Sequence, residues 1–239
     1  MTETEWIACT DPTPMLDHLR GGLGERKLRL FAVACCRRVW HLLIDERARH
    51  AVEVAERYAD GLASKGDLDI ARDAFRDAQS EAFSASVDFP TGEKAAIHCA
   101  YVAFSFTAIT DGWSAYGPSH YAATAAGWAA CGSRGVVEAQ DSAAFAAADR
   151  AEREGQAALL RDIFGTPSGS VDIGPSSLTP AVVALSQAIY SGRAFDRMRI
   201  LADALEETGC TDATILGHCR EPGAHVRGCC VIDAVLGKK

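Results

Sequence analysis

Residues 25–43 read ERKLRLFAVACCRRVWHLL, and this stretch decides the fold class. Its apolar side chains recur at spacings of three and four residues, which places them along one stripe of a helix. The stripe consists of Leu28, Phe31, Ala32, Cys35, Val39, Leu42 and Leu43. We therefore expect an amphipathic α-helix that packs this stripe against other elements.

The helical period continues along the rest of the chain. Asp45 is expected to cap a second helix that ends near Gly61, and Asp67 to open a third. Residues 95–109 are apolar nearly all round, as in a central bundle helix, and are shorter than the roughly 18 to 20 residues of a membrane span. A long helix is expected over 136–164. No stretch alternates like a strand, so the predicted fold class is all-α.

A loop or linker is expected where Gly, Pro and Ser are concentrated, at residues 166–180 (TPSGSVDIGPSSLTP). Thr179 followed by Pro180 is a typical start for the helix that follows. The predicted architecture is a helical bundle over residues 1–165 and a small helical C-terminal module over residues 181–239.

The composition is that of an ordinary globular protein. The chain has 239 residues, 48% of them apolar and 23% charged, with a net charge of −8, which excludes intrinsic disorder and collagen-like order. The start lacks the apolar segment of a secretory signal, so we expect a cytoplasmic protein. Stable disulfides are rare in the cytoplasm, so the nine cysteines are expected to be thiols or metal ligands.

Cys and His are densest between residues 210 and 230. A structural zinc ion needs four ligands in a tetrahedron, often supplied as two close pairs. Cys219 and His225 can form one pair across the Pro-Gly turn, and His225 and Cys229 share a face if the last helix begins early. The candidate ligands are Cys210, His218, Cys219, His225 and Cys229. The spacing matches no standard zinc finger, and in the alternative interpretation these cysteines pack as small apolar side chains.

The same cluster leaves a thiol nucleophile as a further alternative. It would require a partly exposed thiol whose pKa is lowered by His, Arg or a helix N-terminus. Cys219 lies between His218 and Arg220, and Cys229 lies near Arg227. Adjacent residues rarely face one another on a helix, which argues against Cys219 with His218.

The helix expected after residue 25 also carries a basic face. Residues 20–49 have a local charge of +5, against −13 for the remainder of the chain. The face is formed by Arg26, Lys27, Arg37, Arg38 and His41. It is suited to an acidic partner or a phosphate, although the net negative charge argues against nucleic acid. Alternatively, these arginines pair with acidic residues of neighbouring helices, such as Glu53, Glu56, Asp73 and Asp77.

Several strings carry a resemblance: TETEW and CTDP at the start, RKLRLFAVACCRRVWHLL, LLRDIFG, and FDRMRILADALEETGC with HCR and HVRGC near the end. They resemble an expanded paralogous family of bacterial proteins, and LADALEETG is similar to the core of the helical module called a repeat-companion domain. The resemblance is strong at both ends and weak over residues 64–150. It implies no activity, substrate or catalytic residue. It does imply an aromatic residue at the position of Cys230, which argues against Cys230 as an essential ligand.

No phosphate-binding loop, GxSxG, HExxH, EF-hand or Rossmann motif occurs in the chain. We therefore expect a non-enzymatic helical protein that binds another protein or associates with itself, with no membrane partner. Zinc binding by the C-terminal cluster is the first alternative. Binding of an acidic partner by the basic face is the second.

Overall fold

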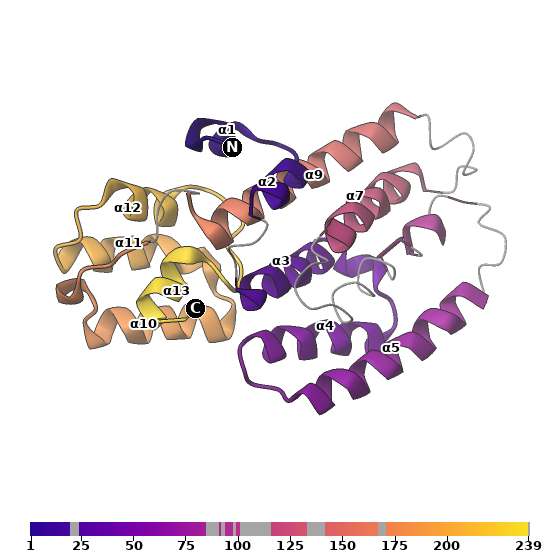
Figure 1. The fold of residues 1–239 in the computed structure, drawn as a ribbon, viewed down its shortest axis with the longest axis horizontal. Coiled ribbons are helices and arrows are strands. Elements are labelled where there is room, and N and C mark those ends of the chain that lie inside the picture. The colour runs from indigo at the N-terminus through magenta and orange to yellow at the C-terminus, as the bar shows by residue number, and fades with distance from the viewer. Residues whose placement is uncertain are drawn as a thin grey trace. The chain divides into compact units, whose positions relative to one another are not determined.

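The computed structural model describes residues 1–19, 24–84, 91, 94–97, 99–100, 116–132, 142–166 and 171–238. Within these ranges every regular element is a helix and no strand occurs, which confirms the predicted all-α class (Figure 1). The helix expected over 95–109 and the start of the one expected over 136–164 lie largely outside the described ranges. None of the helices described is both long and apolar enough to span a membrane.

The chain divides into two compact units. One consists of residues 10–156, and the other of residues 1–9 together with 157–239. The division falls inside helix α9 (Ala143–Phe164), and it assigns the first residues of the chain to the C-terminal unit. The linker expected over 166–180 stays a prediction, since residues 167–170 lie outside the described ranges.

The unit of residues 10–156 is built around helix α3. Its elements are α2 (Pro12–His18), α3 (Glu25–Arg38), the 3-10 turn η1 (Trp40–Leu42), α4 (Glu46–Ala59), α5 (Lys65–Ser84), α7 (Tyr116–Cys131) and the first part of α9. Helix α3 packs against both α4 and α7, and α4 packs against α5. Leu30, Val33 and Cys36 are therefore buried in addition to the predicted stripe, while Leu28 is only half-buried.

A buried polar network connects α3, α9 and α7 in this unit. Arg38 Nε donates to Glu152 Oε1 at 2.8 Å, and Gln156 Nε2 donates to the same oxygen at 3.1 Å. Ser119 Oγ donates in turn to Gln156 Oε1 at 2.6 Å. A Cβ atom at Gly155 would overlap the Arg38 guanidinium, so the close approach requires glycine.

The C-terminal unit has its own apolar core. Its elements are α1 (Glu3–Ala8), the end of α9, η2 (Pro175–Ser177), α10 (Pro180–Gly192), η3 (Phe195–Arg197), α11 (Met198–Glu207), α12 (Ala213–Arg220) and α13 (Cys230–Leu236). Helix α10 packs against α11 and α13, and α11 packs against α12. Thr179 caps α10, where its Oγ1 accepts from the backbone N–H of Val182 at 3.4 Å, and Asp212 caps α12. Thr179 therefore begins α10 at the predicted place.

Three hydrogen bonds fix helix α1 to the end of α9. Trp6 Nε1 donates to the carbonyl of Gly165 at 2.8 Å, and Arg161 Nη1 donates to the carbonyls of Cys9 at 2.8 Å and of Trp6 at 3.4 Å. Trp6 is only 1% exposed. Helix α1 therefore belongs with the C-terminal unit, whereas the predicted boundary at residues 166–180 assigns it to the bundle.

Candidate metal centre

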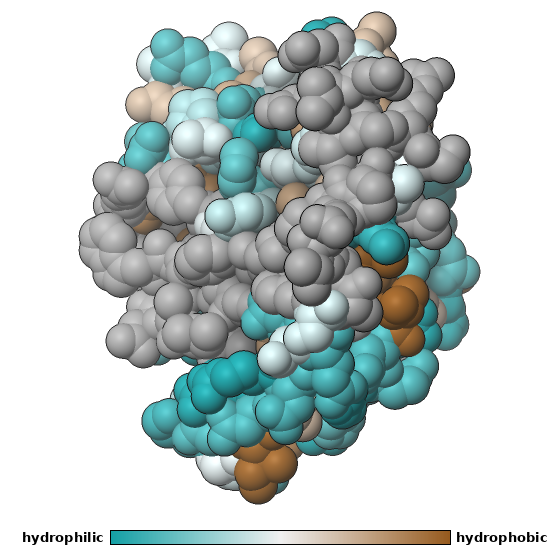
Figure 2. All heavy atoms as spheres, turned by 90° about the vertical axis from the view of Figure 1, so that its right-hand side faces the viewer, coloured by the Kyte–Doolittle hydropathy of each residue, from teal (hydrophilic) through white to brown (hydrophobic). Residues whose placement is uncertain are grey.

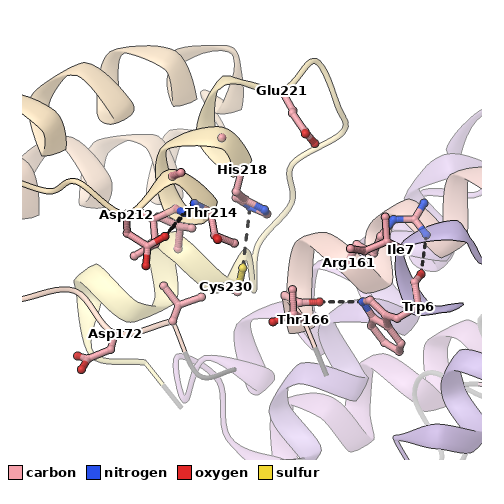
Figure 3. A pocket seen from close by; sticks show the side chains of 16 residues that line it. Trp6, Ile7, Arg161, Thr166, Asp172, Asp212, Thr214, His218, Glu221 and Cys230 are labelled. Atoms are coloured by element: carbon pink, nitrogen blue, oxygen red, sulfur yellow. Dashed lines mark hydrogen bonds between the residues drawn. The ribbon is translucent and has the colours of Figure 1, made fainter. Parts of the chain in front are cut away.

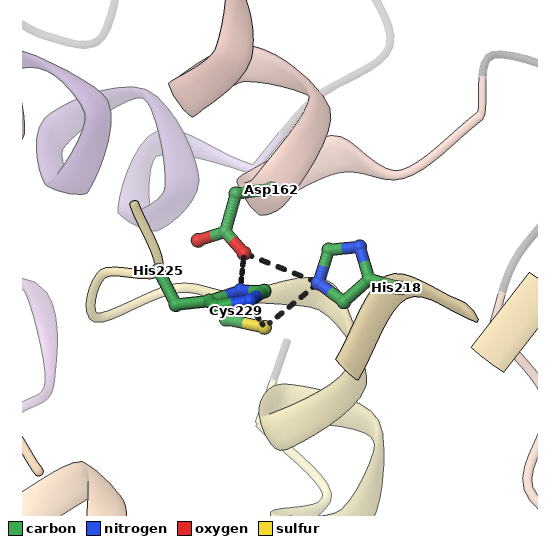
Figure 4. A group of neighbouring side chains, drawn as sticks. All are labelled: Asp162, His218, His225 and Cys229. Carbon is green, nitrogen blue, oxygen red and sulfur yellow. Dashed lines mark hydrogen bonds and ion pairs between the residues drawn. The ribbon is translucent and has the colours of Figure 1, made fainter. Parts of the chain in front are cut away.

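Four side chains of the C-terminal unit form a group that could hold a metal ion (Figure 4). Asp162 lies in the last turn of α9 and His218 lies in α12. His225 lies in the segment between α12 and α13, and Cys229 is the residue before α13. The group therefore joins the end of α9 to the C-terminal helices.

The segment over residues 221–229 is held by hydrogen bonds to its neighbours. The backbone N–H of Val226 donates to Asp162 Oδ2 at 3.0 Å. Arg227 Nε donates to the carbonyl of Tyr190 at 3.3 Å. The N–H of Cys229 donates to the carbonyl of Val226 at 3.0 Å, which turns the chain into α13. These bonds position His225 and Cys229, neither of which lies in a helix.

The four potential ligand atoms all lie within 4.8 Å of one another. Asp162 Oδ1 is 2.6 Å from His225 Nδ1 and 3.1 Å from His218 Nε2. Cys229 Sγ is 3.2 Å from His218 Nε2 and 4.0 Å from His225 Nδ1. Zinc–ligand bonds of about 2.0 to 2.3 Å in a tetrahedron separate neighbouring ligand atoms by about 3.3 to 3.7 Å. The observed separations bracket that spacing.

Each imidazole presents a single nitrogen to both of its partners. Nε2 of His218 faces both Asp162 and Cys229, and Nδ1 of His225 faces the same two side chains. A Cys–His–Asp proton relay instead uses opposite nitrogens of one ring, one toward the nucleophile and the other toward the carboxylate. The four atoms here lie close enough together that they could hold one metal ion.

Burial and hydrogen bonding set the charges of the group. Burial raises the pKa of Asp162, but hydrogen bonds from His218 and His225 outweigh it and lower this pKa below its usual value. Burial opposes the charged form of His218, yet the hydrogen bond to Asp162 raises its pKa to about 10. Burial raises the pKa of Cys229. Without a metal ion, a protonated imidazole therefore balances the buried carboxylate. A bound cation would replace that proton.

Three of the five ligands predicted from the sequence lie in this group: His218, His225 and Cys229. Cys219 is 1% exposed within the apolar core, and Cys210 packs against the same core. These two thiols match the alternative in which cysteines act as small apolar side chains. Helix α13 begins at Cys230, so a loop rather than a shared helical face brings His225 and Cys229 together.

The thiol-nucleophile alternative receives no support from its two candidates. Burial raises the pKa of Cys219 to about 12, and it also raises the pKa of Cys229. Nucleophilic catalysis would need the opposite shift. Cys230 differs, because hydrogen bonds from Cys229 and from His218 lower its pKa.

Asp162 is the member of the group that the sequence analysis missed. It lies 63 residues before His225, so no local spacing relates it to the Cys/His cluster. The sequence does contain one signal: Asp162 lies among the apolar residues Leu159, Leu160 and Ile163. All three are buried in the structure. An acidic residue on the apolar stripe of a helix has to find a partner, and this pattern marks Asp162.

The predicted basic face is largely engaged within the unit of residues 10–156. Arg26 pairs with Asp60 at 2.9 Å, and Arg37 pairs with Glu56 at 3.1 Å, as in the internal-pairing alternative. Arg38 is the residue of the buried network described above. Lys27 is half-buried and His41 is exposed. Binding of an acidic partner stays a prediction, and it would have to compete with these ion pairs.

Within the described part of the chain, the exposed apolar side chains do not define a docking surface. The large ones there are Met1, Ile7, Ile44, Leu62, Ile70 and Ile200. On the face shown in Figure 2, the described side chains are mainly hydrophilic and the apolar ones occur in small groups. Isolated apolar side chains are normal on protein surfaces. Binding of another protein and self-association therefore stay predictions.

Comparisons of the chain with protein-family models, with curated proteins and with solved structures gave no match. The resemblance to a paralogous bacterial family stays a prediction. Function has to be inferred from the site.

Proposed function

We propose that this protein binds one zinc ion through Asp162, His218, His225 and Cys229. The convergence of their four ligand atoms, with one nitrogen of each imidazole facing both Asp162 and Cys229, is the observation that supports it. The burial of Asp162, which is 4% exposed, adds to it, because a buried carboxylate needs either hydrogen bonds or a cation beside it.

The donor set favours zinc over other common ions. One thiol sulfur, two imidazole nitrogens and one carboxylate oxygen suit a borderline-soft ion that prefers a tetrahedron. Calcium and magnesium prefer oxygen ligands, and copper(II) and nickel(II) often favour square-planar sites. Zinc is therefore the ion that matches both the donors and their arrangement.

Four protein ligands would fill a tetrahedral coordination sphere, which is typical of a structural site. The proposed ion would fix the segment over 221–229 between α9 and α12. This segment contains Glu221, Pro222, Gly223 and Ala224, all of them exposed. The proposed role is thus to stabilise a segment whose residues 221–228 lie outside the apolar core of the unit.

The test is metal content by elemental mass spectrometry, on protein purified without a chelator or a metal-affinity column. We expect one zinc ion per chain in the wild type and none in Cys229→Ser or Asp162→Asn. Cobalt substitution adds a spectroscopic readout: a tetrahedral spectrum with a sulfur-to-metal charge-transfer band that Cys229→Ser removes.

Cys210→Ser is the matched control, since Cys210 is a thiol of the same unit outside the group. It should retain the metal and the charge-transfer band. A wild-type protein that binds no zinc when the metal is supplied would overturn the proposal. Equal loss of zinc in Cys210→Ser and Cys229→Ser would do the same.

A further inference from the structure

A pocket of about 590 Å³ lies next to the metal group, within the C-terminal unit (Figure 3). Trp6 and Arg161 line one side of it, and His218 and Cys230 line another. A volume of this size admits a hydrated ion or a small metal complex. The pocket therefore provides a path from solvent to one ligand of the proposed zinc ion.

Cys230 lies on this path beside the metal group. Its Sγ atom is 4.0 Å from Nε2 of His218, the atom that faces Asp162 and Cys229. The same distance separates Cys229 Sγ from His225 Nδ1 inside the group. Cys230 lines the pocket whereas Cys229 does not. A metal ion held by His218 in the pocket would thus meet the thiol of Cys230 before that of Cys229.

The charges around the pocket favour a cation. Asp172 and Glu221 line it, and both residues are exposed. Asp212 also lines it, but its carboxylate accepts the N–H groups of Thr214 and Ile215. The opposing charges are Arg161, which donates to the carbonyls of Trp6 and Cys9, and the imidazole of His218, which is protonated until a metal ion binds. Carboxylates that line a concave surface raise the local concentration of cations.

We propose that the metal ion enters and leaves through this pocket, with Cys230 as a transient ligand between solvent and the four-residue site. This inference rests on the proposed zinc site. On entry, His218 and the Cys230 thiol each release a proton to water as their bonds to the metal form and two waters leave the ion. On transfer, Cys229 passes its proton to Cys230 as the Cys229 sulfur binds the metal and the bond to Cys230 breaks. The metal keeps its charge throughout.

The test separates rates from affinity. Stopped-flow mixing of zinc-loaded protein with a chromophoric chelator gives the rate of metal loss, mixing of metal-free protein with zinc gives the rate of uptake, and competition at equilibrium gives the affinity. In Cys230→Ser, we expect both rates to fall by about tenfold and the affinity to stay within about twofold. Cys210→Ser should change neither quantity.

Charge variants test the path without touching a buried residue. In Asp172→Asn with Glu221→Gln, uptake should slow at low salt, and the difference should fade at high salt because salt screens exposed charges. Asp196→Asn removes an exposed carboxylate outside the pocket and should have no effect.

The outcomes distinguish the two proposals. If the wild type binds zinc but Cys230→Ser exchanges it at the wild-type rate, the pathway is wrong and the zinc site stands. If Cys230→Ser loses zinc affinity strongly, Cys230 is a resident ligand and the exchange role is wrong. If the wild type binds no zinc, both proposals fail.

Discussion

Replacing Asp162 by alanine removes the only carboxylate of the proposed zinc site and three hydrogen bonds of the metal-free protein. The carboxylate accepts from His225 Nδ1 at 2.6 Å, from His218 Nε2 at 3.1 Å and from the N–H of Val226 at 3.0 Å. Its side chain is 5% exposed, so water cannot replace these contacts. Removing one partner from such a buried charged network costs about 3 to 5 kcal/mol.

Zinc adds a second contribution that the variant cannot gain. At a free zinc concentration one hundred times the dissociation constant, binding stabilises the wild type by about 2.7 kcal/mol. The difference between wild type and Asp162→Ala should therefore grow from about 3 to 5 kcal/mol in chelator to about 6 to 8 kcal/mol in zinc. Asp162→Asn keeps an acceptor for Val226, so its loss in chelator should be smaller, about 2 kcal/mol.

The assay is urea unfolding followed by circular dichroism, in chelator and in zinc. Hydrogen exchange of the Val226 amide reports the same contact locally, and this amide should lose protection in Asp162→Ala. Asp172→Asn is the control, because Asp172 is exposed and its replacement should stay within about 0.5 kcal/mol of wild type. A loss below about 1 kcal/mol in chelator would refute the argument from buried hydrogen bonds. An equal loss in chelator and in zinc would refute the metal contribution.

Three further predictions concern the scaffold, with urea unfolding as the measurement for each. Gly155→Ala forces the Arg38 guanidinium away from its carboxylate partner Glu152. The variant should be less stable than the wild type by about 1 to 2 kcal/mol, because the lost hydrogen bond outweighs the small gain in helix propensity. A variant more stable than the wild type would contradict the overlap. Trp6→Phe removes the donor to the end of α9 and should cost about 1 to 2 kcal/mol, and no change would show that this bond does not hold α1. Asp45→Ala removes the cap of α4 and should cost about 1 kcal/mol at neutral pH. Because the hydrogen bond from Arg47 lowers the pKa of Asp45, this difference should be complete above a pH of about 4 and fade as the pH falls through the lowered pKa; a difference independent of pH would show that the charge contributes nothing.

The helices were predictable because their signals are local. Asp45 and Thr179 each stand directly before a periodic apolar run, and each caps a helix in the structure. The predicted stripe of residues 25–43 was too narrow, because periodicity reports the apolar residues of one helix and not how many neighbours surround it. Helix α3 contacts both α4 and α7, and Leu30 and Val33 are buried as well.

The site was predictable only where its residues are close in the sequence. His218, His225 and Cys229 lie within the Cys/His cluster that drew attention to the C-terminus. The roles of Asp162 and Trp6 depend on contacts between segments that are distant in the sequence. Asp162 contacts His225, 63 residues away, and Trp6 donates to a carbonyl 159 residues away. The cluster also suggested Cys219, because spacing cannot distinguish a thiol that faces a ligand group from one that faces an apolar core.

The metal-free network determines how the proposed zinc ion would affect stability. Asp162 and His218 already form a charged pair, and Asp162 also holds His225 and the N–H of Val226. A metal ion would replace the proton of His218 and the thiol proton of Cys229, so part of its binding free energy would be spent on the hydrogen bonds that it displaces. Chelation should therefore lower the melting temperature of the C-terminal unit while leaving it folded, unlike a classical zinc finger, whose chain has no alternative partners for its ligands. For the same reason zinc affinity should fall as the pH is lowered, because protons compete for the same nitrogen and sulfur atoms.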